Sequence, residues 1–585
     1  MDLQHNLATR ALAELLEPAI TELAGQKTLS TYEIAQSFAE APQIELGHFA
    51  FATFPLARAL KLAPPMIAQK LAEALNTQTP PWLKSAVAAG PYLNLKLTSE
   101  AYGEWVLAPI LNGDYFKKDL TKLRPKTMIE YSQPNTHKVL HVGHMRNLCL
   151  GDALVRLSRY ANQEVIAATY PGDVGTHVAK TLWYLKNHCP SQAPETGKGA
   201  WLGELYTLAT HKLEDEKGTE KEAQNRTELT AILKQLEEKS GEYYTLWVET
   251  REWSLNLMNE AYDWANVKFD RWFYESEVDG PSLKLMQDYL AKGLLVRDQG
   301  AVGMDLSEDD LGFCLLIKTD GTGLYATKDV ALAKKKFEEF GIEKNIYIVD
   351  NRQARHFKQV FKVLEKIGFE QAKNCYHLQY DVVELPDGAM SSRKGNIVPL
   401  MTLIHQMEET ITERYLEKYR GQWSDEEIKK TATQVAAGAI KYGMIRMDNQ
   451  RKIVFDMNEW LKLDGETGPY LQYVHARILS MVEKFEKPTQ LHAEHLTHIS
   501  EERLLVKLSR FNDIMLFAAQ NLKTVGVCSY LFELGKLFNQ FYAECSISHA
   551  PTEEIKQARL SLARATAITM KQGLELCGIE APRRM

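Results

Sequence analysis

Two histidines flank a short glycine-containing turn, with a lysine just upstream, in the segment 130–147, EYSQPNTHKVLHVGHMRN. His141 and His144 are about one helical turn apart, Gly143 stands between them, and Lys138 precedes them. Such imidazoles share a helix face, and a helix N-terminus offers unpaired N–H groups that suit phosphate. Glycine lets a ligand approach the backbone closely. The segment therefore indicates hydrogen-bond donors for a phosphate on which charge builds up. A metal-binding pair and two hydrogen-bonded structural histidines are the alternatives.

A second polar segment, MSSRKGN at 390–396, follows a predicted strand in a distant part of the chain. It combines small, hydroxylic and basic residues, and a loop of this composition can close over a triphosphate. On its own it would be read as an ordinary basic surface turn. Together with the histidine segment, it favours nucleotide binding.

The elements around these two segments follow a strand–turn–helix–strand order. TMIEYS (127–132) and EVIAATYPGD (164–173) are strand-like, and the residues between them have apolar positions at helical spacing. This is one half of a doubly wound α/β unit. After an interruption the pattern resumes with the candidate strands FCLLIKT and NIYIVD, the amphipathic helix ARHFKQVFKVLEKIG and the strand LQYDVVEL.

Three regions are predicted from the change of pattern along the chain. Residues 1–115 form a small α/β module, with helices near 8–23, 31–40 and 65–75 and a strand at 92–99. Residues 116–400 form the α/β domain, with an insertion at about 185–290 whose charge-rich part, 185–265, is predicted to be helical and solvated. Residues 401–585 are helical, with a bundle at about 456–585.

The composition is that of an ordinary globular protein rather than of a membrane or disulfide-rich protein. The 585 residues exceed one core, so two to four domains are expected. No apolar run approaches the roughly 20 residues that span a bilayer. The seven cysteines include no Cys-x-x-Cys pair, which favours a cytoplasmic protein without a structural zinc site. A net charge of −7 does not exclude a local basic surface for RNA.

The two nucleotide-type segments, in this order and separation, resemble the paired signatures of class I aminoacyl-tRNA synthetases. HVGH is similar to the HIGH signature and MSSRK to the KMSKS signature. Further segments resemble the arginyl-tRNA synthetase family within that class: YPGDVGTH, FDRWFYESEV, GTGLYATKDVALAKKK, IVDNRQARHFKQVFKVLEKIG, LPDGAMSSRKGN, GPYLQYVHAR and CGIEAPRRM. AGPYLNLKL is similar to the additional N-terminal domain of that family, so the resemblance covers nearly the whole chain.

The resemblance implies a fold and an activity. The fold would be α/β: a class I Rossmann-type catalytic domain with a helical insertion, a small α/β N-terminal domain and an all-helical C-terminal anticodon-binding domain. The activity would be the two-step ligation of L-arginine to tRNA(Arg), with ATP and Mg²⁺. The protein is expected to be a monomer, to hold no tightly bound metal and not to associate with membranes.

The resemblance also assigns the nucleotide site. ATP would be contacted by the residues of the two signatures: His141, Gly143, His144, Met390, Ser391 and Ser392. The loop lacks both lysines of KMSKS, since the aligned residues are Ala-Met-Ser-Ser-Arg at 389–393. Lys138, three residues before the first histidine, is expected to compensate, with Arg393 and Lys394 assisting catalysis from the loop.

Selectivity for arginine requires a particular pocket. Guanidinium has five planar N–H donors and no acceptor, so it needs carboxylates and neutral acceptors. Tyr325 and Asp329 are four residues apart and would share a helix face. By resemblance, Asp329 pairs with the guanidinium, and Tyr325 and Gln353 complete the pocket. The other end of the substrate would be held by Glu130, Ser132, Asn135 and His144; the family usually has serine where this chain has Gln133.

The tRNA contacts are implied mostly by resemblance. Tyr470 and Tyr473 are one turn apart, and exposed aromatic side chains can stack on unpaired bases. They would face the anticodon loop, near Met585, although one of them could instead belong to a buried aromatic stripe. Tyr92 and Asn94 match positions that meet the tRNA elbow.

Two other functions are compatible with parts of the pattern. Nucleotidylyltransferases and pantothenate synthetase also use HxGH, but they usually lack a long helical C-terminal domain and the YATKD segment. A non-catalytic RNA-binding relative would retain the fold, and damage to His141, His144 or the loop would support that reading. Neither histidine is replaced here.

Overall fold

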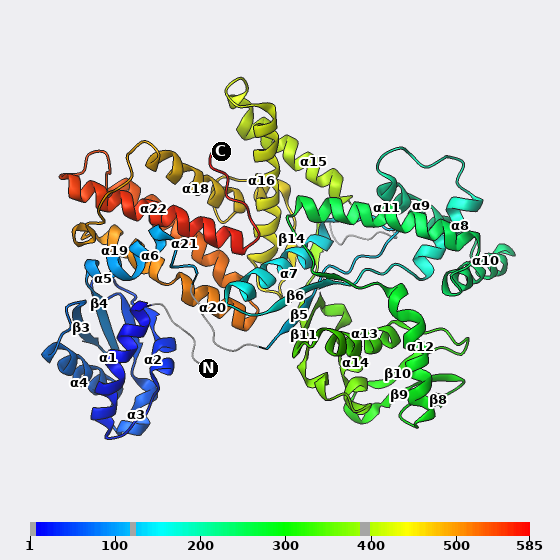
Figure 1. Cartoon of the computed structure of the whole chain (residues 1–585), viewed down its shortest axis with the longest axis horizontal. Coiled ribbons are helices and arrows are strands. Elements are labelled where there is room, and N and C mark those ends of the chain that lie inside the picture. Colours follow the sequence, from blue (N-terminus) through cyan, green and yellow to red (C-terminus); the bar gives the residue numbers. More distant parts are fainter. Residues whose placement is uncertain (1–6, 118–124, 387–397) are drawn as a thin grey trace. The chain divides into compact units, whose positions relative to one another are not determined.

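The computed structural model describes residues 7–117, 125–386 and 398–585. The contacts between residues divide the chain into two compact units. Unit 1 comprises 1–124, 157–162 and 462–585, and unit 2 comprises 125–156 and 163–461. Figure 1 labels many of their elements. No helix in the described part of the chain is long and apolar enough to cross a bilayer.

The N-terminal part of unit 1 is built on a four-stranded antiparallel sheet in the order β1-β2-β4-β3. Strand β4, the third in this order, buries Leu93, Leu95 and Leu97. These alternate residues gave the apolar pattern from which a strand was predicted at 92–99. The elements are α1 (Leu7–Ala24), α2 (Thr31–Ser37), β1 (Ala39–Glu40), β2 (Phe49–Ala52), α3 (Phe54–Leu60), α4 (Pro64–Thr77), β3 (Leu83–Ala89), β4 (Tyr92–Leu97), α5 (Ser99–Tyr102), the π-helix η1 (Gly103–Leu107) and α6 (Ala108–Asn112).

The C-terminal part of unit 1 is helical, as predicted. The single helical run expected at 503–522 is two helices, because the chain turns at Arg510, which ends one helix and precedes the next. The elements are α18 (Gly468–Val482), η7 (Ala493–His495), α19 (Ile499–Ser509), α20 (Phe511–Asn521), α21 (Val525–Glu544) and α22 (Glu553–Leu576).

Unit 2 is built on a five-stranded parallel sheet in the order β12-β11-β5-β6-β7. The strand order reverses at β5, which has β11 on one side and β6 on the other. Met128 and Ala168 of the sheet share a core with Val330 of α13 and Val360 of α14. The elements are β5 (Thr127–Glu130), α7 (Val142–Tyr160), β6 (Val165–Thr169), β7 (Arg271–Trp272), α13 (Tyr325–Phe340), β11 (Lys344–Asp350), η3 (Asn351–Gln353), α14 (Ala354–Lys366), η4 (Glu370–Asn374) and β12 (Cys375–Tyr380).

The insertion is helical, as predicted, and its helices have a core of their own. Buried Trp183, Ile232 and Trp247 pack together, while the outer faces carry the charged residues that the sequence shows. The elements are α8 (Thr176–Asn187), α9 (Lys198–Asp215), α10 (Lys221–Glu237) and α11 (Glu242–Trp264).

A small antiparallel sheet, in the order β10-β9-β8, follows the insertion. FCLLIKT was expected to belong to the main α/β pattern, and this was wrong: it forms β10, which pairs with β9 rather than with the parallel sheet. A short apolar strand has the same pattern in either sheet, so the sequence alone cannot assign it. The elements are α12 (Glu275–Ala291), β8 (Val296–Asp298), β9 (Ala301–Leu306), η2 (Ser307–Asp309) and β10 (Gly312–Ile317).

The last part of unit 2 contains the helices between 400 and 445, which were predicted within a C-terminal domain that starts at 401. Helical periodicity does not reveal on which unit a helix packs. The limits 1–115, 116–400 and 401–585 therefore stay predictions. The elements are β13 (Val383–Glu384), α15 (Leu400–Ile411), the π-helix η5 (Thr412–Leu416), η6 (Glu417–Tyr419), α16 (Asp425–Ile445), β14 (Ile453–Val454) and α17 (Met457–Trp460).

Candidate active site

A cavity of about 840 Å³ opens in unit 2 where the strands β5, β6, β11 and β12 end. This is the switch point of the parallel sheet, where open α/β folds bind their ligands. The predicted residues among those that line it are Glu130, Ser132, Asn135, His141, Gly143, His144, Tyr325, Asp329 and Gln353. Met390, Ser391, Ser392, Arg393 and Lys394 lie outside the described residues.

The two histidines stand at the start of α7 with their rings 4.0 Å apart, centroid to centroid. The Gly143 N–H donates to His141 Nδ1 (3.1 Å), and the His141 N–H donates to His144 Nδ1 (3.1 Å). Each Nδ1 is therefore an acceptor, and each neutral ring carries its proton on Nε2. Burial, helped by the charge of Arg352, lowers the pKa of His141 to about 4. Burial and His141 lower the pKa of His144 well below its usual value.

Lys138 lies on a loop that the insertion helices hold in place. Its ammonium nitrogen is 5.0 Å from the ring centroid of Tyr206, on α9. Gly203, also on α9, lies so close to the loop that a Cβ there would be 2.3 Å from Val139 Cγ2. The charge of Lys138 is one of the causes that lower the pKa of His144. Lys138 is not among the residues that line the cavity; α9 contacts both its ammonium group and the neighbouring backbone.

The adjacent His137 fastens the same loop to α11. It has a left-handed backbone, with φ of 58°, and is fully buried. Its N–H donates to Ser254 Oγ, and its Nε2 lies 2.9 Å from Thr250 Oγ1. Burial lowers the pKa of His137 to about 3, so its ring is neutral near pH 7. The insertion therefore supports the loop, a role that its charged sequence did not reveal.

Glu130 ends β5 at the base of the cavity. Its Oε2 pairs with Lys336 Nζ of α13, and both side chains are almost completely buried. Gln133 Nε2 donates to the other oxygen, Oε1, at 3.5 Å. The Lys336 ammonium also lies over the Tyr347 ring, 4.6 Å from its centroid. Lys336 therefore holds the Glu130 carboxylate through Oε2, while Glu130 and Gln133 both line the cavity.

The turn after β5 is fixed by side-chain contacts. The Ser132 N–H donates to Asn147 Oδ1 (2.7 Å), and the Ser132 hydroxyl lies 2.9 Å from that of Tyr262. Ser132 was predicted to hold the substrate, and here its hydroxyl and N–H both contact the protein. Asn135 and Gly172 form an isolated parallel β-bridge. A Cβ at position 172 would be 2.3 Å from Asn135 Oδ1, so glycine permits this close approach.

Tyr325 and Asp329 lie on the first turns of α13, so the predicted helix is confirmed. Asp329 Oδ2 is 2.6 Å from His356 Nε2. Burial lowers the pKa of His356, but the hydrogen bond and charge of Asp329 outweigh it and raise that pKa overall. Tyr325 is 62% exposed, so its ring is accessible to a ligand.

Glu275 is another carboxylate that lines the cavity together with Asp329, and it is not among the residues predicted from the sequence. It begins α12 and is 6% exposed. Burial raises the pKa of Glu275 to about 7, although Lys328 Nζ, 3.4 Å away, acts in the opposite direction. The sequence signal was its place in FDRWFYESEV, three residues after Trp272, where β7 ends. The acidic wall facing Tyr325 therefore has two carboxylates rather than one.

The residues predicted to contact tRNA lie in unit 1. Tyr92 is 44% exposed, Tyr473 is 37% exposed, and Tyr470 is partly buried, with its hydroxyl accepting from Asn539 Nδ2 (3.0 Å). Asn94 is 2% exposed, because it lies inside the sheet with its amide near the Val87 carbonyl. A direct contact with RNA would require Asn94 to leave that position. Met585 is the last residue and is partly exposed.

The paired histidines at the switch point of a parallel sheet, together with a helical C-terminal part, define a class I aminoacyl-tRNA synthetase. The family model for the catalytic domain of class I tRNA synthetases (R) matches 107–457. The DALR anticodon binding domain matches 471–585, and the arginyl tRNA synthetase N-terminal domain matches 10–97. The chain belongs to the arginyl-tRNA synthetase family.

Individual relatives match all or nearly all of the chain. The chain is 54% identical to an arginine–tRNA ligase of Bdellovibrio bacteriovorus, and the match covers 100% of both chains. It is 32% identical to one of Parabacteroides distasonis over 92% of this chain and 94% of that protein. Its fold is similar to that of the Thermus thermophilus arginyl-tRNA synthetase, with a TM-score of 0.81, 26% identity and coverage of 98% and 100%.

Proposed function

We propose that this protein is an arginine–tRNA ligase that activates L-arginine with ATP and transfers it to the 3′ end of tRNA(Arg). The observation that carries the proposal is that one cavity combines an acidic wall, Asp329 and Glu275, with two neutral imidazoles, His141 and His144. The acidic wall suits a guanidinium, and the imidazole pair suits a phosphate. An enzyme that joins arginine to ATP needs both within one substrate length.

The acidic wall would bind the arginine side chain. Asp329 and Glu275 offer carboxylate oxygens to the planar N–H donors, and the Tyr325 hydroxyl offers a neutral acceptor. Gln353, at the end of η3, would close the wall. A lysine substrate would offer a compact ammonium instead of a planar fork, so it could not satisfy the same set of acceptors.

The opposite end of the substrate would lie over Glu130 and Asn135. Glu130 Oε1 is the acceptor for the α-ammonium group, with the amides of Gln133 and Asn135 beside it. This arrangement would direct the α-carboxylate of arginine toward the histidine pair. The reacting oxygen would then meet the α-phosphorus of ATP.

Activation is a displacement at phosphorus that requires alignment and charge stabilisation. A carboxylate oxygen of arginine forms a bond to the α-phosphorus, the bond to the bridging oxygen breaks, and pyrophosphate leaves. The Nε2–H groups of His141 and His144 would donate to the phosphate oxygens, and Lys138 would add a full positive charge. We expect ATP to enter as its Mg²⁺ complex, because phosphates are the usual Mg²⁺ ligands in such sites.

In the transfer step, a ribose hydroxyl at the tRNA 3′ end attacks the arginyl carbonyl carbon. The hydroxyl oxygen forms the ester bond, the bond between the carbonyl carbon and the phosphate oxygen breaks, AMP leaves, and the hydroxyl proton is released to water. Contact with tRNA is assigned to Tyr92, Tyr470, Tyr473 and Met585, and Asn94 is assigned only an indirect role through the sheet that bears Tyr92. We further propose that the protein acts as a monomer in the cytoplasm.

ATP–pyrophosphate exchange tests the assignment of the substrate. We expect exchange with L-arginine, and we expect it only when cognate tRNA is present. Each other amino acid, including lysine and citrulline, should give background exchange under the same conditions. Robust exchange with another amino acid but not with arginine would refute the proposal.

A further inference from the structure

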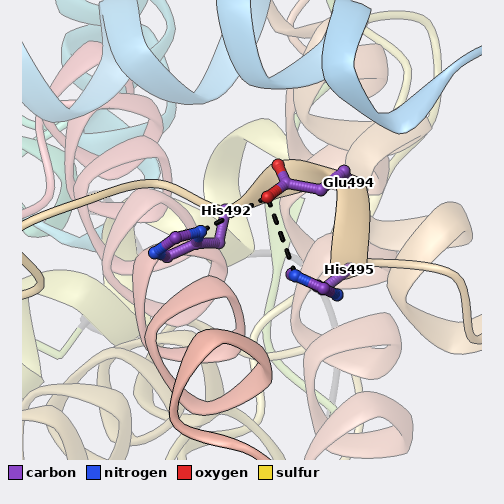
Figure 2. A group of neighbouring side chains, drawn as sticks. All are labelled: His492, Glu494 and His495. Carbon is purple, nitrogen blue, oxygen red and sulfur yellow. Dashed lines mark hydrogen bonds and ion pairs between the residues drawn. The ribbon is translucent and has the colours of Figure 1, made fainter.

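Outside the active site, three possible metal ligands converge on a short turn of unit 1. His492 Nδ1 is 3.3 Å and His495 Nε2 is 3.7 Å from the same oxygen, Glu494 Oε1. The three ligand atoms all lie within 4.8 Å of one another. Figure 2 shows the carboxylate of Glu494 between the two imidazoles, with a dashed line to each ring. A common point close to all three groups could hold one cation.

The spacing agrees with metal coordination. Zinc lies about 2.0–2.2 Å from imidazole nitrogen and carboxylate oxygen, and in a tetrahedral site two such ligands are therefore roughly 3.4 Å apart. The two measured separations from Glu494 Oε1 are close to this value. The two nitrogens lie within 4.8 Å of each other, and a rotation of the His495 imidazole, which is 41% exposed, can adjust their separation.

The backbone holds the turn in this conformation. His492 has φ of 49°, a left-handed conformation that turns its ring toward Glu494. Ala493 and Leu496 are buried, and Leu496 O accepts a hydrogen bond from Ser99 Oγ of α5 (2.7 Å). A Cβ at Gly103 would lie 2.5 Å from the Ala493 Cβ, so the turn packs closely on η1. The ligands therefore need little ordering when a cation binds.

We propose that His492, Glu494 and His495 bind one divalent transition-metal cation, with zinc as the best fit. Two imidazole nitrogens and one carboxylate oxygen suit zinc, whereas magnesium and calcium prefer oxygen ligands. The three side chains are 23%, 45% and 41% exposed, so water can occupy the remaining position. The cysteine pattern excludes only a thiolate site of the Cys-x-x-Cys kind.

A second element contributes charge to this site. Glu554, in the first turn of α22, interacts electrostatically with both imidazoles. It adds negative charge that favours a cation from the side of α22. The turn also contacts α5, so a bound cation would stiffen the place where α5 and α22 meet η7.

The alternative is a carboxylate paired with protonated imidazoles and no metal, and a titration separates the two. The full-length protein is prepared without a polyhistidine tag, treated with chelator, and titrated with Zn²⁺ by calorimetry and with Co²⁺ by visible absorption. Imidazole is neutral at the mildly alkaline pH required. We expect one equivalent of each metal with saturable binding, and tetrahedral cobalt bands.

The variant H492A/H495A should lose this equivalent, and E494Q should bind at least about tenfold more weakly, a difference of about 1.4 kcal/mol. H549A, which removes an exposed histidine of the same unit outside the cluster, should bind like the unchanged protein. The rate of aminoacylation without added zinc should be the same in the unchanged protein and in all three variants, which shows that the variants are folded. Absence of saturable binding, or equal uptake by H492A/H495A, would overturn the proposal.

Discussion

Lys336 and Glu130 form an ion pair that is almost completely buried at the base of the candidate active site. Lys336 comes from α13, the helix that begins with Tyr325 and Asp329. In its first turns, α13 therefore carries two residues that we assign to the guanidinium, and in its later turns it carries the lysine that pairs with Glu130, which we assign to the α-ammonium group. Under the proposed function, this one helix links the two ends of the arginine pocket.

The first prediction concerns this pair. Lys336→Met leaves the buried charge of Glu130 without its partner, so we expect the free energy of unfolding to fall by about 3–5 kcal/mol. Urea unfolding measures this loss. The KM for arginine should rise at least about tenfold, an effect of about 1.4 kcal/mol, because Lys336 no longer holds the Glu130 carboxylate in position.

A double variant separates stability from recognition. Glu130→Gln with Lys336→Met removes both charges and should recover most of the stability but not the arginine KM. Lys335→Ala, which alters a neighbouring and more exposed lysine of α13, is the matched control. If the double variant regained normal arginine KM, the role of Glu130 in binding would be wrong.

The second prediction concerns Asp329. Asp329→Asn keeps the shape but removes the carboxylate, so kcat/KM for arginine should fall by about 100-fold, which is about 2.7 kcal/mol. His356→Asn also removes the contact between Asp329 and His356 but keeps the Asp329 carboxylate, so kcat/KM for arginine should fall less. Steady-state kinetics at varied arginine measures both. Equal losses in the two variants would mean that the ion pair, not the arginine contact, matters.

The third prediction is a pH dependence from Glu275. Its pKa in the folded protein is raised from 4.5 to about 7, mainly by burial. Only the ionised form attracts guanidinium, so kcat/KM for arginine should increase as pH rises through about 7. Folding stability should change in the opposite direction. The folded state binds more protons than the unfolded state between these two values, so stability falls as pH rises through that window.

Glu275→Gln provides the comparison. It should remove the rise of kcat/KM near pH 7 while leaving a lower, flatter profile. It should also flatten the dependence of urea unfolding on pH between about 4.5 and about 7, the two pKa values of Glu275. An unchanged pH–rate profile in this variant would exclude Glu275 from arginine recognition.

The fourth prediction concerns Lys138. Lys138→Ala should lower kcat by at least about tenfold, or about 1.4 kcal/mol, with little change in tRNA affinity, because it removes charge from the phosphate end of the site. Lys217→Ala changes an exposed lysine of the same insertion region and should leave kcat unchanged. Presteady-state formation of arginyl-adenylate locates the defect in the first step. A normal rate in Lys138→Ala would dismiss the compensating role.

The fifth prediction separates the two tyrosines of α18. Tyr473→Ala should weaken tRNA binding without loss of stability, since its ring is partly exposed. Tyr470→Ala should lower stability as well, since its hydroxyl accepts from Asn539 and its ring contacts that of Phe532. Filter binding of tRNA and thermal unfolding give the two readouts. Loss of stability without loss of affinity in Tyr473→Ala would exclude an RNA contact.

Helices and strands whose apolar residues recur at a regular spacing could be predicted from the sequence. So could the site residues that belong to a recognisable motif. The helix from Tyr325, the strand at Tyr92 and the histidine turn are local features, and all three are present. β10 pairs with its chain neighbour β9 rather than with the parallel sheet, and a short apolar strand has the same pattern in either sheet. Lys336 pairs with Glu130, which is 206 residues away, and no local pattern specifies such a partner.

Glu275 shows a further limit of sequence reasoning. Its spacing to Asp279, one turn further along α12, does not point to a substrate pocket, and only the packing of α12 beside α13 brings it into the same cavity as Asp329. The support that the insertion gives to Lys138 was hidden for a similar reason. The charged outer faces of these helices dominate the sequence, while Gly203 and Ser254 act from the inner faces.

Direct identification of the aminoacylated product tests the central claim. The purified protein is incubated with ATP, Mg²⁺, total tRNA and all twenty amino acids, and the 3′-terminal nucleoside is released by nuclease and analysed by mass spectrometry. We predict arginyl-adenosine as the dominant product, dependent on ATP and lost in Asp329→Asn. Another aminoacyl-adenosine in its place, or arginyl-adenosine that persists undiminished in Asp329→Asn, would contradict this account.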